Sequence, residues 1–243
     1  EVAIAATTQI GDQGLTLGRT AGILSGLPES VPGFSIDRMC AGAMTAVTTV
    51  SSGIGVGAYD IALAAGVEHM GEGGDTNPRC VYERVVDTDA LQMGKTAENL
   101  HDMLPHITKE RTDAYALASQ RKTAAAYAAG LIQPDLVPVA IRGMDGAYGL
   151  ATVDEPPRPE TTLEGLGSLK TPFRPHGRIT AGNAAGLNDG ATAAALAAEE
   201  VADELGLAKK MRLVSFAFAG VAPDIMGYGP VPSTIKALDK AGL

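Results

Sequence analysis

Short apolar runs alternate with helix-like segments along the first 70 residues, and this alternation most constrains the fold. Val2–Ala6 and 59–70 are apolar enough for buried strands, and 34–40 reads as another strand that leads into a cysteine. Residues 16–27 and the small-residue stretch from 41 to about 54 have helical spacing instead. Strands joined through helices predict an α/β fold with layers around a mostly parallel sheet.

A long irregular stretch, about 72–177, interrupts this pattern. It holds two predicted helices, Thr96–Met103 and Lys109–Ala129, and a predicted strand over 136–142. Residues 154–178 are rich in proline and locally basic. A segment this long between framework elements predicts a lid or subdomain.

The α/β framework returns after this insert. Periodicity alone leaves open whether Ala191–Ala197 is a strand or a helix. Residues 212–220 alternate small and larger side chains and predict a strand, and Pro232–Leu243 predicts a helix.

Composition excludes several classes of function. The net charge of −9, the 4% aromatic content and the absence of tryptophan argue against nucleic-acid binding. No apolar run reaches the ~18 residues of a membrane helix. The four histidines form no zinc-ligand pattern, so we expect no metal. Two cysteines make no disulfide framework, which favours reduced thiols and a cytoplasmic location.

Cys40 is the candidate nucleophile. It lies between a predicted strand and a predicted helix, where unpaired backbone N–H groups favour a thiolate. Its small neighbours Ala41, Gly42 and Ala43 leave room for a substrate. Locally the alternative is a buried, inert cysteine. Cys80 lies in a turn-rich segment and is interpreted as an incidental loop thiol.

Three further segments are candidates for ligand binding. "GNAAGLNDGA" (182–191) combines amide side chains with glycines that permit close backbone approach, although such clusters are often plain turns. Residues 158–178 gather basic side chains that would attract a phosphorylated ligand, or form a solvated loop. "PDIMGYGPVP" (223–232) predicts a rigid turn whose Met226 would line a pocket or fill the core.

Taken together, these segments resemble the thiolase family. "DRMCAGAMTAV" resembles the segment with the acyl-accepting cysteine, and "GRITAGNAAGLNDGATA" is similar to the family's most recognisable internal motif. "RPETTLEGLGSLKTPF" and "TKERTDAYALASQRKTAAA" match its coenzyme A-binding insert. "GVAPDIMGYGPVPSTIKALDKAGL" resembles the entry to its C-terminal half. The similarity runs in order along the whole chain and favours Cys40 as a nucleophile.

The resemblance implies a layered αβαβα thiolase fold with an inserted coenzyme A-binding loop subdomain. Residues 1–71 would begin the N-terminal thiolase domain, 72–177 would form the insert, 178–207 would return to the N-terminal domain, and 208–243 would begin the C-terminal domain. The family's "NEAF", "GGAIALGHP" and "CxGGGxG" motifs, with an asparagine, a histidine and a second cysteine of its active site, do not occur in the chain. We therefore expect it to cover about the first two-thirds of an enzyme.

The implied activity is thiolytic cleavage of a 3-ketoacyl-CoA to acetyl-CoA and a shortened acyl-CoA through an acyl-enzyme on Cys40. Coenzyme A and acyl-CoA are substrates, and no cofactor is expected. Arg158 would contact the phosphate or adenine end of coenzyme A. The other predicted binding residues wall the pantetheine and acyl channel or hold the loop beside it. They are Gln92, Met93, Phe173, Ala181, Gly182, Asn183, Ala185 and Met226.

Two positions depart from familiar family patterns. Ala185 stands where members often carry serine, which removes one hydroxyl contact to the pantetheine arm. Gln92 stands where biosynthetic acetoacetyl-CoA thiolases have histidine, and this favours a degradative enzyme of β-oxidation.

Alternatives remain open at this point. The chain could be a catalytically silent relative that binds coenzyme A or lipid, a biosynthetic acetoacetyl-CoA thiolase, or a decarboxylating ketoacyl synthase of related fold. Kinship also implies a homodimer or homotetramer, with a β-oxidation partner subunit as a further option.

Overall fold

The computed structural model describes residues 2–6, 16–70, 92–143, 145–208 and 211–243, which divide into two compact units. The first unit contains the described residues up to Met70, together with Leu187–Ala219 and Val231–Leu243. The second contains the described residues from Gln92 to Gly186, together with Gly220–Pro230.

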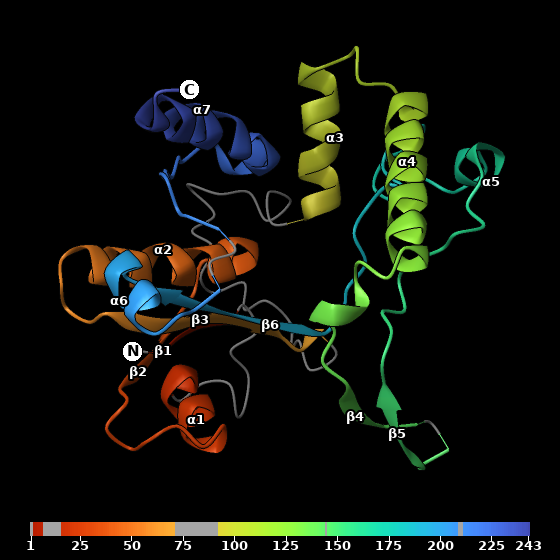
Figure 1. Cartoon of the computed structure of the whole chain (residues 1–243). Coiled ribbons are helices and arrows are strands. Elements are labelled where there is room, and N and C mark those ends of the chain that lie inside the picture. The colour runs from red at the N-terminus through yellow and green to blue at the C-terminus, as the bar shows by residue number, and fades with distance from the viewer. Residues whose placement is uncertain (1, 7–15, 71–91, 144, 209–210) are drawn as a thin grey trace. The chain divides into compact units, whose positions relative to one another are not determined.

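A four-stranded sheet forms the centre of the first unit (Figure 1). Its strands lie in the order β2 (Gly33–Ile36), β1 (Val2–Ala6), β3 (Ile61–Glu68) and β6 (Gly190–Ala197). β1 runs parallel to both of its neighbours, and β6 runs antiparallel to β3. The predicted mostly parallel sheet is confirmed. Residues 191–197, for which periodicity leaves strand and helix open, form most of the strand β6.

Two helices lie on opposite faces of this sheet, α1 (Leu17–Leu24) and α2 (Gly42–Gly55) (Figure 1). Ala46 and Val50 of α2 are fully buried, and they form one cluster with Ala62 and Ala64 of β3. Because small side chains face each other here, the axis of α2 lies close to the sheet, which fixes the position of its N-terminal end.

The remaining parts of the first unit are the helices α6 (Glu199–Glu204) and α7 (Pro230–Ala241) and an extended segment between them. The predicted strand over 212–220 is wrong, because residues 211–220 pair with no strand among the described residues. A strand exists only as part of a hydrogen-bonded ladder, and alternating side chains alone cannot supply the partner. Side chains hold the segment instead, since Ser215 Oγ donates to the carbonyl of Ala237 in α7 at 2.6 Å.

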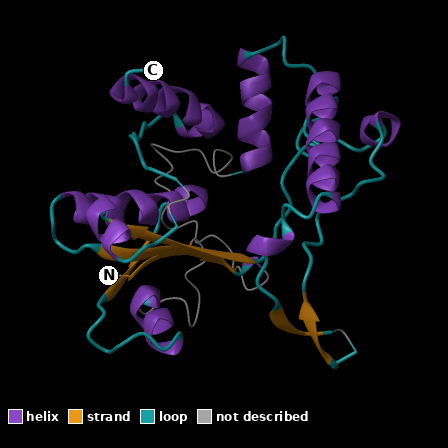
Figure 2. Cartoon of the chain, viewed as in Figure 1, coloured by secondary structure: helices purple, strands orange, loops and turns teal. Residues whose placement is uncertain are grey.

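The second unit is mostly helix and loop (Figure 2). Its helices are α3 (Met93–Met103), α4 (Lys109–Ala128) and α5 (Leu163–Gly167), with short 3-10 turns at Gln133–Asp135 and Pro223–Tyr228. β4 (Val139–Arg142) and β5 (Tyr148–Ala151) pair as an antiparallel hairpin. The sequence predicted β4, whereas β5 was not anticipated. None of the described helices combines the length and the apolar character needed to span a bilayer.

Candidate active site

Cys40 lies on the surface of the first unit, in a short 3-10 turn (Met39–Ala41) immediately before α2. The predicted strand leading into Cys40 is partly wrong, since β2 ends at Ile36. Met39 adopts a φ of 45°, which no strand residue can hold, and its N–H donates to Asp37 Oδ1 at 2.8 Å. The thiol is exposed, so the expectation of a buried cysteine does not describe this structure.

α2 begins directly after the turn that holds this thiol, and the N–H groups of Ala41 and Gly42 donate within that turn to the carbonyls of Arg38 and Met39. Ala41 is the N-cap residue, and no side chain among the described residues caps it. The first N–H groups of a helix carry partial positive charge, and they favour an anion close to the helix N-terminus. Cys40 lies one residue before this cap, and its side chain is exposed.

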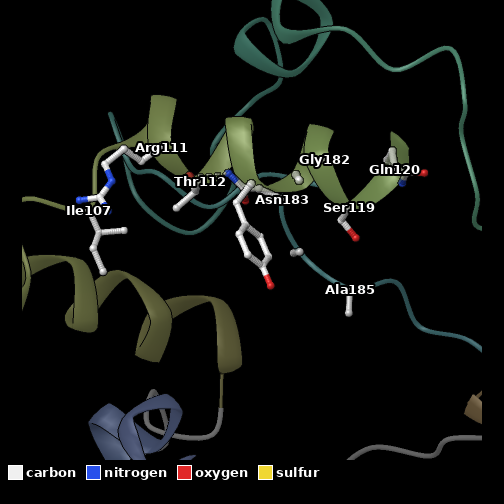
Figure 3. Close-up of a pocket in the computed structure, with 11 residues that line it drawn as sticks. Ile107, Arg111, Thr112, Ser119, Gln120, Gly182, Asn183 and Ala185 are labelled. Carbon is white, nitrogen blue, oxygen red and sulfur yellow. Dashed lines mark hydrogen bonds between the residues drawn. The ribbon is translucent and has the colours of Figure 1, made fainter. Parts of the chain in front are cut away.

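The second unit contains an open pocket of about 490 Å³ between α4 and the loop that carries three of the predicted binding residues. Figure 3 shows Arg111, Thr112, Ser119 and Gln120 along α4, with the loop residues beside them. The loop residues are Gly182, Asn183, Ala184 and Ala185. Ile107, Tyr115 and Ala116 complete the lining.

Asn183 bonds this loop to α4. Its Nδ2 donates to Asp113 Oδ1 at 3.0 Å, to Thr112 Oγ1 at 3.2 Å and to the carbonyl of Arg178 at 2.8 Å. Its Oδ1 accepts from the N–H of Thr180 at 2.8 Å. One amide thus uses its donors and its acceptor to define the loop, which leaves Asn183 a framework residue of the pocket wall.

The loop also depends on a close approach at Gly182. A Cβ placed there would lie 2.4 Å from Leu166 Cδ2 and 2.6 Å from Leu169 Cδ1. Any larger residue at this position would therefore require the Leu166 and Leu169 side chains to move. Ala181 is exposed beside it and is not among the pocket-lining residues.

Arg158 is exposed, and its backbone is tied to the pocket wall. Gln120 Oε1 accepts a hydrogen bond from the N–H of Arg158 at 2.8 Å. The Arg158 guanidinium makes none of the protein contacts found among the described residues, so it is available to an anionic ligand. Gln120 was not singled out from the sequence, because a polar residue on a polar helix carries no local signal of a contact 38 residues away.

Two other members of the predicted basic cluster, Arg174 and Arg178, make contacts within the second unit. Arg174 Nη1 donates to both carboxylate oxygens of Asp102 at 2.8 Å. Arg178 Nη1 donates to the carbonyls of His101 at 3.0 Å and Ile107 at 2.7 Å. These two guanidiniums therefore bind groups of the same chain.

Three predicted apolar residues gather around α3. Met93 opens the helix, and the Phe173 ring packs on Gly94, where an added Cβ would lie 2.3 Å from ring carbons. Met226 lies in the 3-10 turn that Asn99 holds to α3 by donating to the carbonyl of Asp224 at 2.9 Å. The side chains of Met93, Phe173 and Met226 are 48%, 40% and 40% exposed. Gln92 is exposed just before the helix.

Two polar side chains of α3, those of Glu98 and His101, are buried in the second unit. Glu98 is 2% exposed and accepts from the N–H groups of Arg178 and Ile179 at 2.8 and 2.9 Å. His101 is also buried, and its Nδ1 lacks a partner among the described residues. Burial, with the nearby Arg178 charge, lowers the pKa of His101 below 6.5.

Cys40 belongs to the first unit and the predicted binding residues to the second. Cys80 lies outside the described residues. Within the described ranges no three His, Cys, Asp or Glu side chains gather as a metal-binding group.

Comparison with known proteins identifies the family. Residues 1–200 match the family model described as "Thiolase, N-terminal domain". The chain is 39% identical to the beta-ketoadipyl-CoA thiolase of Escherichia coli, over 100% of the chain and 65% of that protein. It is 41% identical to the peroxisomal 3-ketoacyl-CoA thiolase A of Rattus norvegicus, over 95% of the chain and 55% of that protein.

Solved structures agree with the sequence matches. The crystal structure of human mitochondrial 3-ketoacyl-CoA thiolase superposes with a TM-score of 0.88 at 32% identity, over 100% of this chain and 65% of that one. The acetyl-CoA acetyltransferase of Bacillus anthracis gives 0.85 at 33% identity, over 99% and 64%. The chain thus spans 55% to 65% of the length of these relatives. With an α/β thiolase-like fold and a matched family model over most of its length, the chain belongs to the thiolase family.

Proposed function

We propose that the chain supplies the acyl-accepting cysteine and coenzyme A-binding residues of a thiolase that cleaves 3-ketoacyl-CoA. The observation that carries this proposal is the exposed thiol of Cys40 immediately before the N-terminal end of α2, in a member of the thiolase family. A structural cysteine has no need of this exposure.

The proposed chemistry proceeds by two acyl transfers. The Cys40 thiolate attacks the 3-keto carbon, the bond between carbons 2 and 3 breaks, and the electron pair stays on the departing acetyl-CoA carbanion, which is then protonated. The thiolate of a second coenzyme A attacks the thioester and restores Cys40. Backbone N–H groups around Cys40 would stabilise the oxyanion in one step. The resemblance assigns the proton transfers to a histidine and a second cysteine in motifs outside this chain.

The second unit would bind the coenzyme A moiety. Its pocket joins the predicted loop residues Gly182, Asn183 and Ala185 to a helix whose Gln120 holds the backbone of Arg158. The free guanidinium of Arg158 would pair with phosphate, and the exposed apolar side chains around α3 would contact the pantetheine or acyl chain. Gln92, which cannot titrate, supports a degradative enzyme of β-oxidation over a biosynthetic one.

The proposal also covers the oligomeric state and the cellular compartment. We expect a homodimer or homotetramer by kinship, and a reducing compartment such as the cytoplasm because the sequence has two cysteines only. Peroxisomal enzymes occur among the relatives, so compartment and substrate are to be tested together.

Alkylation of Cys40 separates an active enzyme from a silent relative. In the complete polypeptide, iodoacetamide should label Cys40 rapidly near neutral pH, and coenzyme A esters should protect it. Arg158→Ala should weaken this protection without changing the unprotected rate, whereas Lys122→Ala, also exposed, serves as the control. Slow labelling of Cys40, at the rate of an ordinary thiol and without protection, would support the silent relative.

A further inference from the structure

The backbone around Cys40 follows an unusual path. Arg38 has φ −147° and ψ 40°, and Met39 has a positive φ of 45°. The N–H of Ala41 donates to the carbonyl of Arg38 at 3.1 Å, which closes the turn. A backbone in sparsely populated conformations persists only where surrounding contacts hold it.

The side chain of Arg38, in this turn, contacts a residue that is distant in sequence. The guanidinium carbon of Arg38 lies 4.0 Å from the ring centroid of Phe218, well inside the ~6 Å range of a cation–π contact. Both residues belong to the first unit.

Phe218 is itself fixed. Its ring meets that of Phe216 edge-on at 5.8 Å between centroids, and Lys240 of α7 lies 5.9 Å above the Phe216 ring. With the Ser215 bond to α7, these contacts tie the extended segment to a twelve-residue helix. A continuous set of contacts therefore runs from α7 through Phe218 to the residue two positions before Cys40.

The side chains of this turn lie at the surface. Asp37, Arg38, Met39 and Cys40 are all exposed, so core packing does not define their positions. Among the described residues, the Asp37 bond to Met39 and the Arg38 contact with Phe218 are the side-chain interactions found for these four residues. The first is local, whereas the second connects the turn to the rest of the unit.

We infer that Arg38 is a positioning residue for Cys40, acting through its cation–π contact with Phe218. Loss of the contact releases the turn, so the thiol spends less time in the orientation that attacks the 3-keto carbon of the substrate. The inference rests on the proposed role of Cys40 as the acyl acceptor.

A double-mutant cycle in the complete polypeptide tests it. The variants are Arg38→Ala, Phe218→Leu and their combination, with Arg38→Lys as the conservative variant and the exposed Arg212→Ala as a matched control from the same segment. The readouts are the rate of Cys40 acylation by acetoacetyl-CoA, the KM for that substrate, and the rate of iodoacetamide labelling, resolved from Cys80 by peptide mass spectrometry. Thermal unfolding reports any structural loss.

Each single variant should slow acylation about three- to fivefold with KM unchanged, which corresponds to the strength of an exposed cation–π contact. The double variant should be no slower than either single variant, Arg38→Lys should recover most of the rate, and Arg212→Ala should match the parent. Parental rates in both single variants, additive losses, or losses explained by a lower unfolding temperature would overturn the inference. Failure of the parent protein to acylate, with labelling rates that still follow the cycle, would instead overturn the proposed function.

Discussion

The side-chain amide of Asn183 donates to the buried carboxylate of Asp113 at 3.0 Å and joins the 178–185 loop to α4 across 70 residues of sequence. Lys109 Nζ contacts the other oxygen of the same carboxylate at 2.5 Å. The geometry of the candidate coenzyme A pocket therefore depends on an acid that touches no part of the pocket opening.

Asn183→Ala should destabilise the second unit by about 1–3 kcal/mol, because it leaves the buried Asp113 oxygen and the Thr180 N–H without their partner. Asn183→Asp should cost more, since it places a second carboxylate beside Asp113. Denaturant unfolding measures both, and the exposed Asn188→Ala is the control. A change for Asn183→Ala no larger than for Asn188→Ala would contradict the assigned role.

Gly94→Ala should destabilise the protein by about 1–3 kcal/mol, despite the better helix propensity of alanine, because the new Cβ overlaps the Phe173 ring. Gly55→Ala in α2 is the matched control, as a Cβ there meets nothing within 4 Å. Adding Phe173→Ala should make the Gly94 substitution nearly neutral. Equal thermal unfolding of the two glycine variants would show that the ring does not pack as described.

Gln120→Ala should raise the dissociation constant for coenzyme A about threefold, because Arg158 loses the bond that orders its backbone. Arg158→Ala should have a larger effect, and the double variant should bind no more weakly than Arg158→Ala. Calorimetric titration with coenzyme A measures the affinities. Additive losses would mean that Gln120 acts independently of Arg158.

His101 should make stability depend on pH. Its pKa is lowered in the folded protein by burial and by Arg178, so the unfolded chain takes up a proton first as the pH falls through 6.5. The contribution of His101 to the free energy of unfolding is therefore complete above about pH 6.5. It decreases below that pH until the folded protein also binds the proton.

Replacement of His101 by glutamine should make the denaturation midpoint depend less on pH between about pH 5 and 7. His106→Gln, at an exposed position, should leave the parental slope unchanged. An equal slope in the parent and in His101→Gln would place the pH dependence on other groups.

Local signals predicted the longer helices and two of the central strands. The helix predicted over Lys109–Ala129 agrees with α4 to within one residue. Thr108 caps its start, where its Oγ1 accepts from the Arg111 N–H at 3.4 Å. Gly130 takes a positive φ of 70° just beyond its end. The strands β1 and β3 followed from apolar content alone.

Contacts distant in sequence could not be predicted. The pairing of 191–197 with β3 decides its conformation, and the absence of a partner decides that of 212–220. The acids Glu98 and Asp113 lie on helices with polar sequences, where their burial depends on loops 70 or more residues further along the chain. The strained turn at Met39 likewise carries no pattern that separates it from a strand end.

The most direct test of the account is the mass of Cys40-containing peptides after the complete polypeptide is mixed with a 3-ketoacyl-CoA and quenched. The account predicts one added acyl group on Cys40, removed by free coenzyme A and absent in Cys40→Ala, with Cys80→Ala unaffected. An acyl group on another residue, or an adduct that survives in Cys40→Ala, would contradict it.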